Sequence, residues 1–571
     1  MKNLYRSLSA ILLLSATNAA IAATPPPTTG PLQAAQSIAL SEHAMLAGTL
    51  SLPNHNMVLL LTDAESFDIT AQCLAPDGHT VWKTGLKRFQ RPAGTGYMFD
   101  TRQIALGRSA RENKQLQKDK MAAQLYPVNV LTDGNSVVLA ERLDEEAFKK
   151  QNKDKSLKDG QMFIQRLDEK GGLQAHLFDP RPEPESKKTE ANTLGRYADA
   201  TGYAEVVRET NKREETLVFA AMHYDLGTKT VRREVLELPA TPEHIGGLNS
   251  FRHWYQEWAY LGHRPNQTYF CRRTLTSVAA PKEKAGNQPL VYQVHIADDQ
   301  GGLAGGFSTT LGLNKGTRPM YSGYMPSPGE MNHIPFNFSA SAGKNNYVTY
   351  DEWDVSCGGM GSFYLDYRTG DVLIYGEYGE GDLPEMRDNG DLLGFFERRF
   401  APDGRVVAQV QGPYSEAMRA KKKKASFKGY SYRSTRFHLD PFTGQSQFSF
   451  APLRLYGNSE DFDLFMDKDL KPLRYDYLPG KDKDERTYTS VMYTQPFKLA
   501  TTFNSTDEIR LYEHAGKTDH PVYAALEKQR RAAPADASDH WFHLCPTGPA
   551  SGLVVEQNRA LGGSLQVYTF Q

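Results

Sequence analysis

The chain has 571 residues, with 66 lysine or arginine against 67 aspartate or glutamate, so its formal net charge is −1. A chain so close to neutral has no global field that attracts nucleic acid or an anionic membrane, which excludes partners chosen by charge alone. Its length exceeds the size at which one ordinary core stops growing, and therefore predicts either several domains or a ring of repeated units.

The first 22 residues are typical of a secretion signal. Lys2 and Arg6 give a positive start, an apolar run covers residues 8–14, and the tripeptide "AIA" at 20–22 supplies the small residues that signal peptidase accepts. The apolar run is too short to span a bilayer, and no later segment approaches the roughly 20 apolar residues of a transmembrane helix. We therefore expect an exported chain, periplasmic or extracellular, that does not span a membrane.

The opening part of the remaining chain contains a β-hairpin at residues 66–82, "SFDITAQCLAPDGHTVW". Apolar residues alternate from Phe67 to Cys73 and so fall on one face of a strand. Pro76, Asp77 and Gly78 are the residue types of a tight turn. The stretch predicts strand, turn and strand, and nothing in it requires chemistry.

Similar turns recur along the chain. "FAPDGRVVAQV" repeats the Ala-Pro-Asp-Gly core, and "LDYRTGDVLIY" shares Leu-Asp-x-x-Thr-Gly with "LDPFTGQSQF". Their aspartates, Asp366, Asp403 and Asp440, are equally spaced, since 403 − 366 = 37 and 440 − 403 = 37. Weaker relatives begin at Arg166, Tyr224 and Ile296.

A second hairpin type alternates with the first. "LPNHNMVLL" from Leu52 aligns with "LTDGNSVVL" from Leu131, an offset of 131 − 52 = 79, and "RDNGDLLGFF" from Arg387 is a looser third copy. Two turn types with steps near 40 residues indicate one repeated four-stranded unit, as in propeller blades. We predict one domain over residues 23–571 with about seven blades, with six or eight as alternatives, whose C-terminal strands pair with the N-terminal blade.

Polar, charge-rich stretches interrupt this pattern. They predict loop or helix insertions near residues 103–125, 143–160, 181–200 and 415–428, and residues 520–534 predict a short amphipathic helix.

The cysteines are far apart and form no CxxC pair: Cys73, Cys271, Cys357 and Cys545. An oxidising compartment permits disulfides among them in three pairings, and buried free thiols are the alternative.

The hairpins resemble those of extracytoplasmic β-propeller repeat proteins, in particular the quinoprotein-like group with D-x-x-T-G and D-G-x-x-x-W turns. The likeness covers scattered hairpins across most of the chain and implies an all-β propeller fold. Trp82 alone follows its turn at the quinoprotein tryptophan spacing, and Ala408 stands at that place in another turn. We therefore carry over no quinone-binding residues and predict no cofactor.

Motifs of common catalytic sites are absent from the sequence. Neither G-x-S-x-G, the pattern of serine hydrolases, nor the zinc motif H-E-x-x-H occurs, and the histidines show no metal-ligand spacing. We therefore predict no metal site and name no catalytic residue.

An aromatic segment from Phe251 onward is the first candidate ligand site. Aromatic rings stack on sugars, but they also dominate ordinary cores, which is the alternative. The candidate ligand-binding residues are His253, Trp254, Tyr255, Trp258, His263 and Arg264.

An acidic segment, "YGEYGEGDLPEMRDNGD", is the second candidate. Oxygen-rich loops bind calcium and paired carboxylates hydrolyse glycosidic bonds, although the spacing matches no calcium loop and a solvated loop is the alternative. The candidate residues are Glu377, Glu380, Asp382, Asp388 and Asp391.

The function that this pattern favours is that of an exported binding or scaffold protein, with a glycan, a peptide or another envelope protein as partner. The alternative is an exported hydrolase that acts on a glycan with two carboxylates from different blades, which requires the pair to face each other at roughly 5 to 10 Å. A quinone-dependent oxidoreductase is a third reading. Whether the protein is an enzyme is left open at this point.

Overall fold

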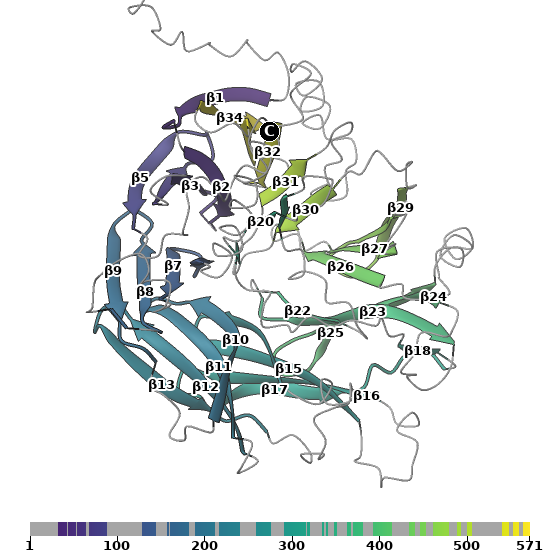
Figure 1. Ribbon diagram of the computed structural model, residues 1–571. Helices are drawn as coiled ribbons and strands as arrows, with labels where there is room; N and C mark the ends of the chain where they lie inside the picture. Colours follow the sequence, from purple (N-terminus) through teal and green to yellow (C-terminus); the bar gives the residue numbers. More distant parts are fainter. Residues whose placement is uncertain are drawn as a thin grey trace, which may run out of the picture.

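Every regular element that the computed structural model describes is a β-strand, and the strands form antiparallel sheets. Figure 1 shows these sheets following one another around a central region in the order of the chain. Within the described part of the chain, no helix has the length and apolar character needed to cross a membrane. The structure describes residues 32–42, 44–52, 54–63, 68–87, 128–143, 157–158, 160–181, 189–211, 216–239, 258–275, 290–315, 317–319, 334–335, 338–340, 348–350, 362–366, 369–380, 392–413, 433–439, 446–452, 461–478, 488–492, 500–504, 540–546, 552–558 and 563–570.

Sheets 1 to 3 are meanders in which four strands pair in chain order. Sheet 1 consists of β2 (Ala44–Ser51), β3 (Met57–Asp63), β4 (Ile69–Leu74) and β5 (Thr80–Leu86). Sheet 2 consists of β6 (Val128–Thr132), β7 (Val137–Arg142), β8 (Met162–Leu167) and β9 (Leu173–Phe178). Sheet 3 consists of β10 (Thr189–Ala198), β11 (Gly202–Asn211), β12 (Thr216–Asp225) and β13 (Thr230–Leu236).

Sheets 4 to 6 repeat the same four-stranded order. Sheet 4 consists of β14 (Ala259–Arg264), β15 (Gln267–Leu275), β16 (Leu290–Asp298) and β17 (Leu303–Thr309). Sheet 5 consists of β22 (Ser362–Leu365), β23 (Val372–Glu380), β24 (Leu392–Phe400) and β25 (Val406–Pro413). Sheet 6 consists of β26 (Arg433–Leu439), β27 (Ser446–Pro452), β28 (Asp461–Met466) and β29 (Pro472–Leu478).

Sheet 7 joins the two ends of the described chain. It consists of β30 (Tyr488–Met492), β31 (Ala500–Asn504), β32 (His540–Pro546), β33 (Gly552–Asn558), β34 (Ser564–Phe570) and β1 (Leu32–Ala39). β1 pairs antiparallel with β34, so that Leu32 lies opposite Phe570 and Ala39 opposite Ser564. The C-terminal strands thus pair with the N-terminal part of the chain, although the partner is the separate strand β1 and not sheet 1.

The segment between β17 and β22 pairs with two sheets that are far apart in the chain. β18 (Thr317–Pro319) pairs with β23 of sheet 5, and β19 (Ile334–Pro335) pairs with β6 of sheet 2. β20 (Phe338–Ala340) and β21 (Val348–Tyr350) pair with each other. β20 is drawn near the centre of Figure 1, and the pairing of β19 with β6 brings part of this segment beside the first strand of sheet 2.

Alternate side chains of β3 belong to two different cores, which explains why its sequence is apolar without interruption from Met57 to Leu61. Met57, Leu59 and Leu61 pack with sheet 7, whereas Val58 and Leu60 pack with sheet 2. Equivalent cores join sheets 2 and 3, 3 and 4, and 4 and 5. Sheets 1 to 4 are therefore each enclosed between two neighbours, and burial of both faces is their main stabilising contribution.

The glycine of the repeated Asp-Gly turn contacts the preceding sheet. Gly78, in the turn between β4 and β5, has a φ of +85° and lies against Ala35 of β1. The same arrangement recurs with Gly171 against Trp82, Gly301 against Val235 and Gly404 against Phe307. A side chain at such a position would meet both a strained backbone and occupied space. The sequence repeat is thus a docking element between sheets.

The 37-residue step corresponds to half of a sheet. Asp366 follows β22, and Asp403 lies between β24 and β25 of the same sheet. Residue 440 follows β26, so equivalent turns of sheets 5 and 6 are 440 − 366 = 74 residues apart, close to the offset of 79 between the first two sheets. The stretch from Arg387 precedes β24, a third strand, and is not a copy of the first hairpin. Two turns with similar sequences occur in each sheet, so the spacing of 37 residues between them resembles the spacing of a full repeat.

The sequence predicts an insertion near residues 181–200, but the structure places strand β10 at Thr189–Ala198 within this range. It pairs with β11 along its whole length, with an irregularity between Thr193 and Gly195. The described side chains in the first half of β10 are half-buried. A half-buried strand tolerates polar residues, and this polar composition is also typical of a loop.

Outside the described residues lie the predicted signal at 1–22, the insertions at 103–125 and 415–428, most of the insertion at 143–160, and the predicted helix at 520–534.

Two of the four cysteines are buried in separate cores. Cys73 lies between sheets 1 and 2, and Cys271 lies between sheets 4 and 5. Burial raises the pKa of the Cys73 thiol to about 12, which makes it unreactive at neutral pH. Cys545 lies in β32 without a described side chain, and Cys357 lies outside the described residues.

Candidate functional site

The two ends of the sheets differ in the length of their connections. At one end, the turns that join first to second and third to fourth strands of sheets 1 to 6 contain two to six residues. At the other end, the connection from β5 to β6 contains 128 − 86 − 1 = 41 residues and that from β13 to β14 contains 259 − 236 − 1 = 22. We call these ends the short-turn end and the long-connection end.

The short-turn ends of neighbouring sheets lie beside one another. Arg166 of sheet 2 donates to a carbonyl in the β10–β11 turn of sheet 3 at 2.6 Å. Tyr197, near the end of β10, stacks on His263 of β14 with ring centroids 3.7 Å apart. Gly370, in the β22–β23 turn, lies against Arg264 at the end of β14. The long connections of sheets 2 to 5 therefore leave from one common end.

The aromatic segment lies mainly in the connection between β13 and β14, at the long-connection end. His253, Trp254 and Tyr255 lie outside the described residues, and ligand binding by them stays a prediction. Trp258 is buried between sheets 3 and 4, where its indole N–H donates to the Pro239 carbonyl at 2.9 Å. The ring of Trp258 is packed as a core residue and presents no exposed face.

His263 and Arg264 lie at the short-turn end, away from the connection that holds Trp254. The His263 imidazole is buried, and its Nδ1 is 3.1 Å from Thr268 Oγ1. Burial lowers the pKa of His263 to about 3, so the ring is neutral at physiological pH. The structure thus places these two candidate residues at the opposite end of β14 from Trp258.

The acidic segment begins on β23 and continues into the β23–β24 connection. Glu380 is the last residue of β23 and is exposed, and Glu377 lies in the same strand without a described side chain. Asp382, Asp388 and Asp391 lie outside the described residues. Because β23 ends at the long-connection end, the acidic segment and the segment around Trp254 are attached to the same end of the molecule.

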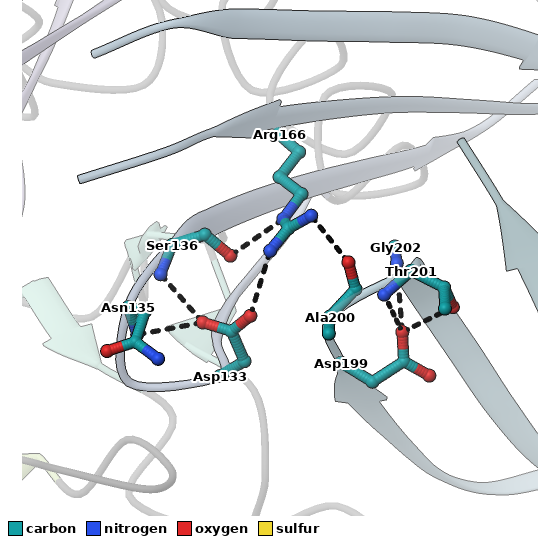
Figure 2. A network of polar contacts seen from close by, with 8 residues as sticks. All are labelled: Asp133, Asn135, Ser136, Arg166, Asp199, Ala200, Thr201 and Gly202. Atoms are coloured by element: carbon teal, nitrogen blue, oxygen red, sulfur yellow. Dashed lines mark hydrogen bonds and ion pairs between the residues drawn. The ribbon is translucent and has the colours of Figure 1, made fainter. Parts of the chain in front are cut away.

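Figure 2 shows a polar network between sheets 2 and 3 at the short-turn end. In this network each nitrogen of the Arg166 guanidinium group donates a hydrogen bond. Its Nε donates to Ser136 Oγ at 3.0 Å, its Nη2 to Asp133 Oδ2 at 3.2 Å, and its Nη1 to the Ala200 carbonyl at 2.6 Å. All three nitrogens therefore have partners. An arginine paired in this way joins two turns, and each of its nitrogens is already held by a protein acceptor.

The Asp199 carboxylate in Figure 2 is used by its own turn. Its Oδ1 accepts from the backbone N–H groups of Thr201 and Gly202, each at 2.8 Å, and from Thr201 Oγ1 at 2.6 Å. Burial acts to raise the pKa of Asp199, but hydrogen bonds from His223, Thr201 and Gly202 outweigh burial and hold the pKa well below its usual range. This carboxylate is a structural anion.

A second group of charges lies between sheets 2 and 3, and we call it the arginine cluster. Its carboxylate, Glu205 of β11, is buried and accepts hydrogen bonds from Arg142 and, at 3.0 Å, from the Tyr203 hydroxyl. Arg196 Nε lies 3.6 Å from Glu205 Oε1. The cluster consists of Arg142, Arg181, Arg196, Tyr203, Glu205 and Tyr224.

Charge and burial act against each other in the arginine cluster. Burial acts to raise the pKa of Glu205, but the charges of Arg142 and Arg196 outweigh it, and the pKa is lowered. Burial raises the pKa of Tyr224 well above its usual range, so this hydroxyl keeps its proton. At neutral pH the cluster therefore holds three guanidinium cations and one carboxylate.

Sequence reasoning missed the arginine cluster because its members come from separate strands and connections. Arg142 ends β7, Arg181 follows β9, Arg196 lies in β10, and Glu205 lies in β11. One local signal existed, since Arg142 is in phase with Val138 and Ala140, which face sheet 3. A charged residue that continues the alternation of buried side chains in a strand indicates that the core contains a polar group at that point.

Glu397 of β24 is a completely buried carboxyl group between sheets 5 and 6. It accepts a hydrogen bond from Ser446 Oγ of β27 at 3.2 Å. Burial raises the pKa of Glu397 to about 8, although Arg399 and the Ser446 hydrogen bond act to lower it. This residue is enclosed in the inter-sheet core and is protonated at neutral pH.

No family model and no curated protein matches this chain. Solved structures with a similar arrangement include a post-proline cleaving enzyme from Rickettsia typhi, with 9% identity, 81% of this chain and 49% of that chain covered, and a TM-score of 0.29. The alignment thus spans about half the length of that enzyme. The polysaccharide lyase Uly1 gives 8% identity, coverage of 77% and 89%, and a TM-score of 0.27.

The WD40 domain of SCAP from fission yeast is a third similar structure, with 8% identity, coverage of 95% of this chain and 97% of that chain, and a TM-score of 0.25. These neighbours are propeller-like proteins, but their TM-scores are too low to carry an argument about activity. The description of the fold therefore rests on the sheets themselves. The chain is an all-β protein of four-stranded antiparallel sheets, consistent with a propeller-like fold.

Proposed function

We propose that the protein is an exported β-propeller that binds its ligand at the long-connection end. Its blades are the seven sheets, and the pairing of β1 with β34 closes the ring. The ligand is a glycan, a peptide or another envelope protein, and the protein acts as a binding or scaffold component. Export is inferred from the signal at residues 1–22, and N-terminal sequencing of the chain recovered from periplasm or medium tests it.

The asymmetry of the connections carries this proposal. Short turns with internally used polar groups, such as those around Asp199 and Arg166, fill one end. The connections at the other end are several times longer in sheets 1, 3 and 5, and binding residues concentrate on loops that a rigid scaffold holds in place. The candidate segments around Trp254 and Asp388 both belong to that end.

Affinity electrophoresis tests the glycan form of this proposal. The purified protein is run through native gels that contain a neutral or an acidic soluble polysaccharide, and retardation measures binding. The double variant Trp254→Ala, Tyr255→Ala is expected to lose most of the retardation, because each stacked ring contributes about 1 kcal/mol or more. The control is Leu303→Ser, a change at an exposed side chain at the start of β17.

Three results contradict parts of the proposal in different ways. Release of reducing ends in proportion to protein concentration identifies the hydrolase alternative. Equal mobility of wild type and double variant in gels that retard both removes Trp254 and Tyr255 from the site. Wild-type mobility that no polysaccharide changes excludes the glycan and leaves the peptide or protein ligand, which the same variants test by pull-down with purified envelope proteins.

A further inference from the structure

We propose that the arginine cluster binds an oxyanion, namely a sulfate, phosphate or carboxylate group of the ligand. The charge balance between sheets 2 and 3 is the first observation that points to it. Among the described residues, three guanidinium groups, those of Arg142, Arg181 and Arg196, act on the single carboxylate Glu205, so this described group holds two more positive than negative charges. Buried charge without compensation is costly, and an anion that enters the cluster relieves the imbalance.

Unused hydrogen-bond donors in the cluster support an incoming anion. Arg181 Nη1, Arg196 Nε and the Tyr224 hydroxyl are buried and have no hydrogen-bond partner among the described residues. Tyr224 is completely buried. Glu205 already accepts hydrogen bonds from Arg142 and Tyr203, and it pairs with Arg196 Nε only as an ion pair at 3.6 Å, beyond hydrogen-bond distance. An oxyanion offers several acceptor atoms and matches guanidinium geometry.

The cluster is partly exposed to solvent, with Arg142 and Arg181 on the side of the long-connection end and Arg196 two residues before the end of β10, toward the short-turn end. The Arg142 side chain is 36% exposed and the Arg196 side chain is 25% exposed, whereas Glu205 is 1% exposed. Arg142 is the last residue of β7, and Arg181 stands just after β9, so both lie where long connections leave sheet 2. Guanidinium groups that are partly exposed above a buried carboxylate form an entrance for an anion.

Two other described arginines between the same sheets, Arg233 and Arg166, each have a carboxylate partner of their own. Arg233 makes two hydrogen bonds to Glu209, of 3.1 and 2.7 Å, and this pair is neutral. Arg166 uses three nitrogens on three acceptors. The surplus of donors and charge is therefore a property of the arginine cluster and not of this inter-sheet region in general.

The inference rests on the proposed function in that it names the charge of the ligand. Its test is separate, because the affinity of the cluster for inorganic sulfate does not depend on Trp254 or Tyr255. If sulfate binds and no polymer does, the oxyanion site stands without the glycan proposal. If neutral polysaccharide binds and sulfate does not, the glycan proposal stands without the oxyanion site.

Isothermal titration of the full exported chain with sodium sulfate at low ionic strength tests the inference. Wild type is expected to give a saturable signal that equal ionic strength of sodium chloride does not give. Arg196→Gln and Arg181→Gln are expected to weaken sulfate binding by about tenfold or more, since each removes a charge-assisted hydrogen bond. Arg232→Gln, at a half-exposed arginine that pairs with Glu234, is expected to bind like wild type.

The outcomes decide the inference in both directions. Loss of binding in both cluster variants with retention in Arg232→Gln supports it, and loss in Arg181→Gln alone suffices if Arg196→Gln does not fold. Absence of a sulfate signal in wild type, or equal affinity in wild type and both cluster variants, overturns it. Dextran sulfate, a polyuronate and unsubstituted dextran are titrated in parallel to separate an anionic polymer from a free anion as the source of the oxyanion.

Discussion

Outside the arginine cluster, the described side chains include polar groups whose charge is balanced locally and polar groups whose charge is suppressed by burial. Arg166 and Asp199 belong to the first kind, because their turns supply every partner that Figure 2 shows. Glu397 belongs to the second, since burial between sheets 5 and 6 keeps its carboxyl group neutral. The second kind makes stability depend on pH.

Glu397 is expected to reduce stability as pH rises above 4.5. Its pKa is about 8 in the folded chain and near 4.5 in the unfolded chain, so only the unfolded state ionises between these values. The contribution of the protonated group is full below pH 4.5 and is lost as pH rises toward 8, at about 1.4 kcal/mol for each unit. Glu397→Gln should therefore match wild type at pH 4.5 and be more stable at pH 8, as measured by urea unfolding.

The control for this pH profile is Glu237→Gln, a change at an exposed side chain after β13. Its unfolding free energy should follow that of wild type at both pH values. A Glu397→Gln profile that runs parallel to wild type from pH 4.5 to 8 would show that the buried carboxyl group is ionised in the folded protein.

At the scale of elements, the hairpin turn between third and fourth strands has two tasks. It reverses the chain, and its glycine fits against the outer strand of the preceding sheet, as Gly78 does against Ala35 and Gly171 against Trp82. Trp82 completes the contact by donating its indole N–H to the Glu169 carbonyl at 2.9 Å. The turn is therefore constrained by a neighbouring sheet as well as by its own geometry.

Gly78→Ala is expected to lower the free energy of unfolding by about 1–3 kcal/mol. The methyl group meets the Ala35 side chain, and φ at this position is +85°, where alanine is strained. Gly85→Ala is the matched control, because Gly85 lies in β5 of the same hairpin and a Cβ added there would have no atom within 4 Å. Equal urea midpoints for the two variants would contradict the docking role of the turn.

At the scale of the whole molecule, β1 links the beginning of the described chain to its end. It adds to β34 in sheet 7, and sheet 7 packs on sheet 1 through the core that contains Ile38, Leu59 and Val567. Residues more than 500 positions apart in sequence thus share one core. The strand contributes to stability only through this long-range packing, because an isolated strand has no hydrogen-bond partner of its own.

Ile38→Asp is expected to destabilise the whole molecule by about 3 kcal/mol or more, because it places a charge in that core. Ser37→Asp, at the adjacent residue of the same strand, should leave stability nearly unchanged. Thermal unfolding followed by circular dichroism compares the two. Similar melting temperatures would mean that β1 is not docked in solution.

The all-β class and the four-stranded unit follow from local pattern, as the alternation from Ile69 to Cys73 and the turn at Gly78 show. The number of residues from one sheet to the next does not follow from local pattern. Two turns of one sheet, at Asp366 and Asp403, contain similar residues and therefore resemble successive repeats. The sequence of β10 reads as a loop because polar residues are tolerated in its half-buried first half. The burial of Trp258 and His263 depends on sheets 3 and 4 meeting, which no local window contains.

The amino-acid sequence by itself determined strands, turns and their alternation, since these depend on residue types within a few positions of one another. Only the tertiary structure decided which faces of the sheets pack together. It therefore also decided which side chains at the short-turn end have their partners in a neighbouring sheet. It also brought Arg142, Arg181, Arg196 and Glu205 together from four parts of sheets 2 and 3. An excess of charge arises from proximity in space, and a sequence that is almost neutral overall does not reveal it.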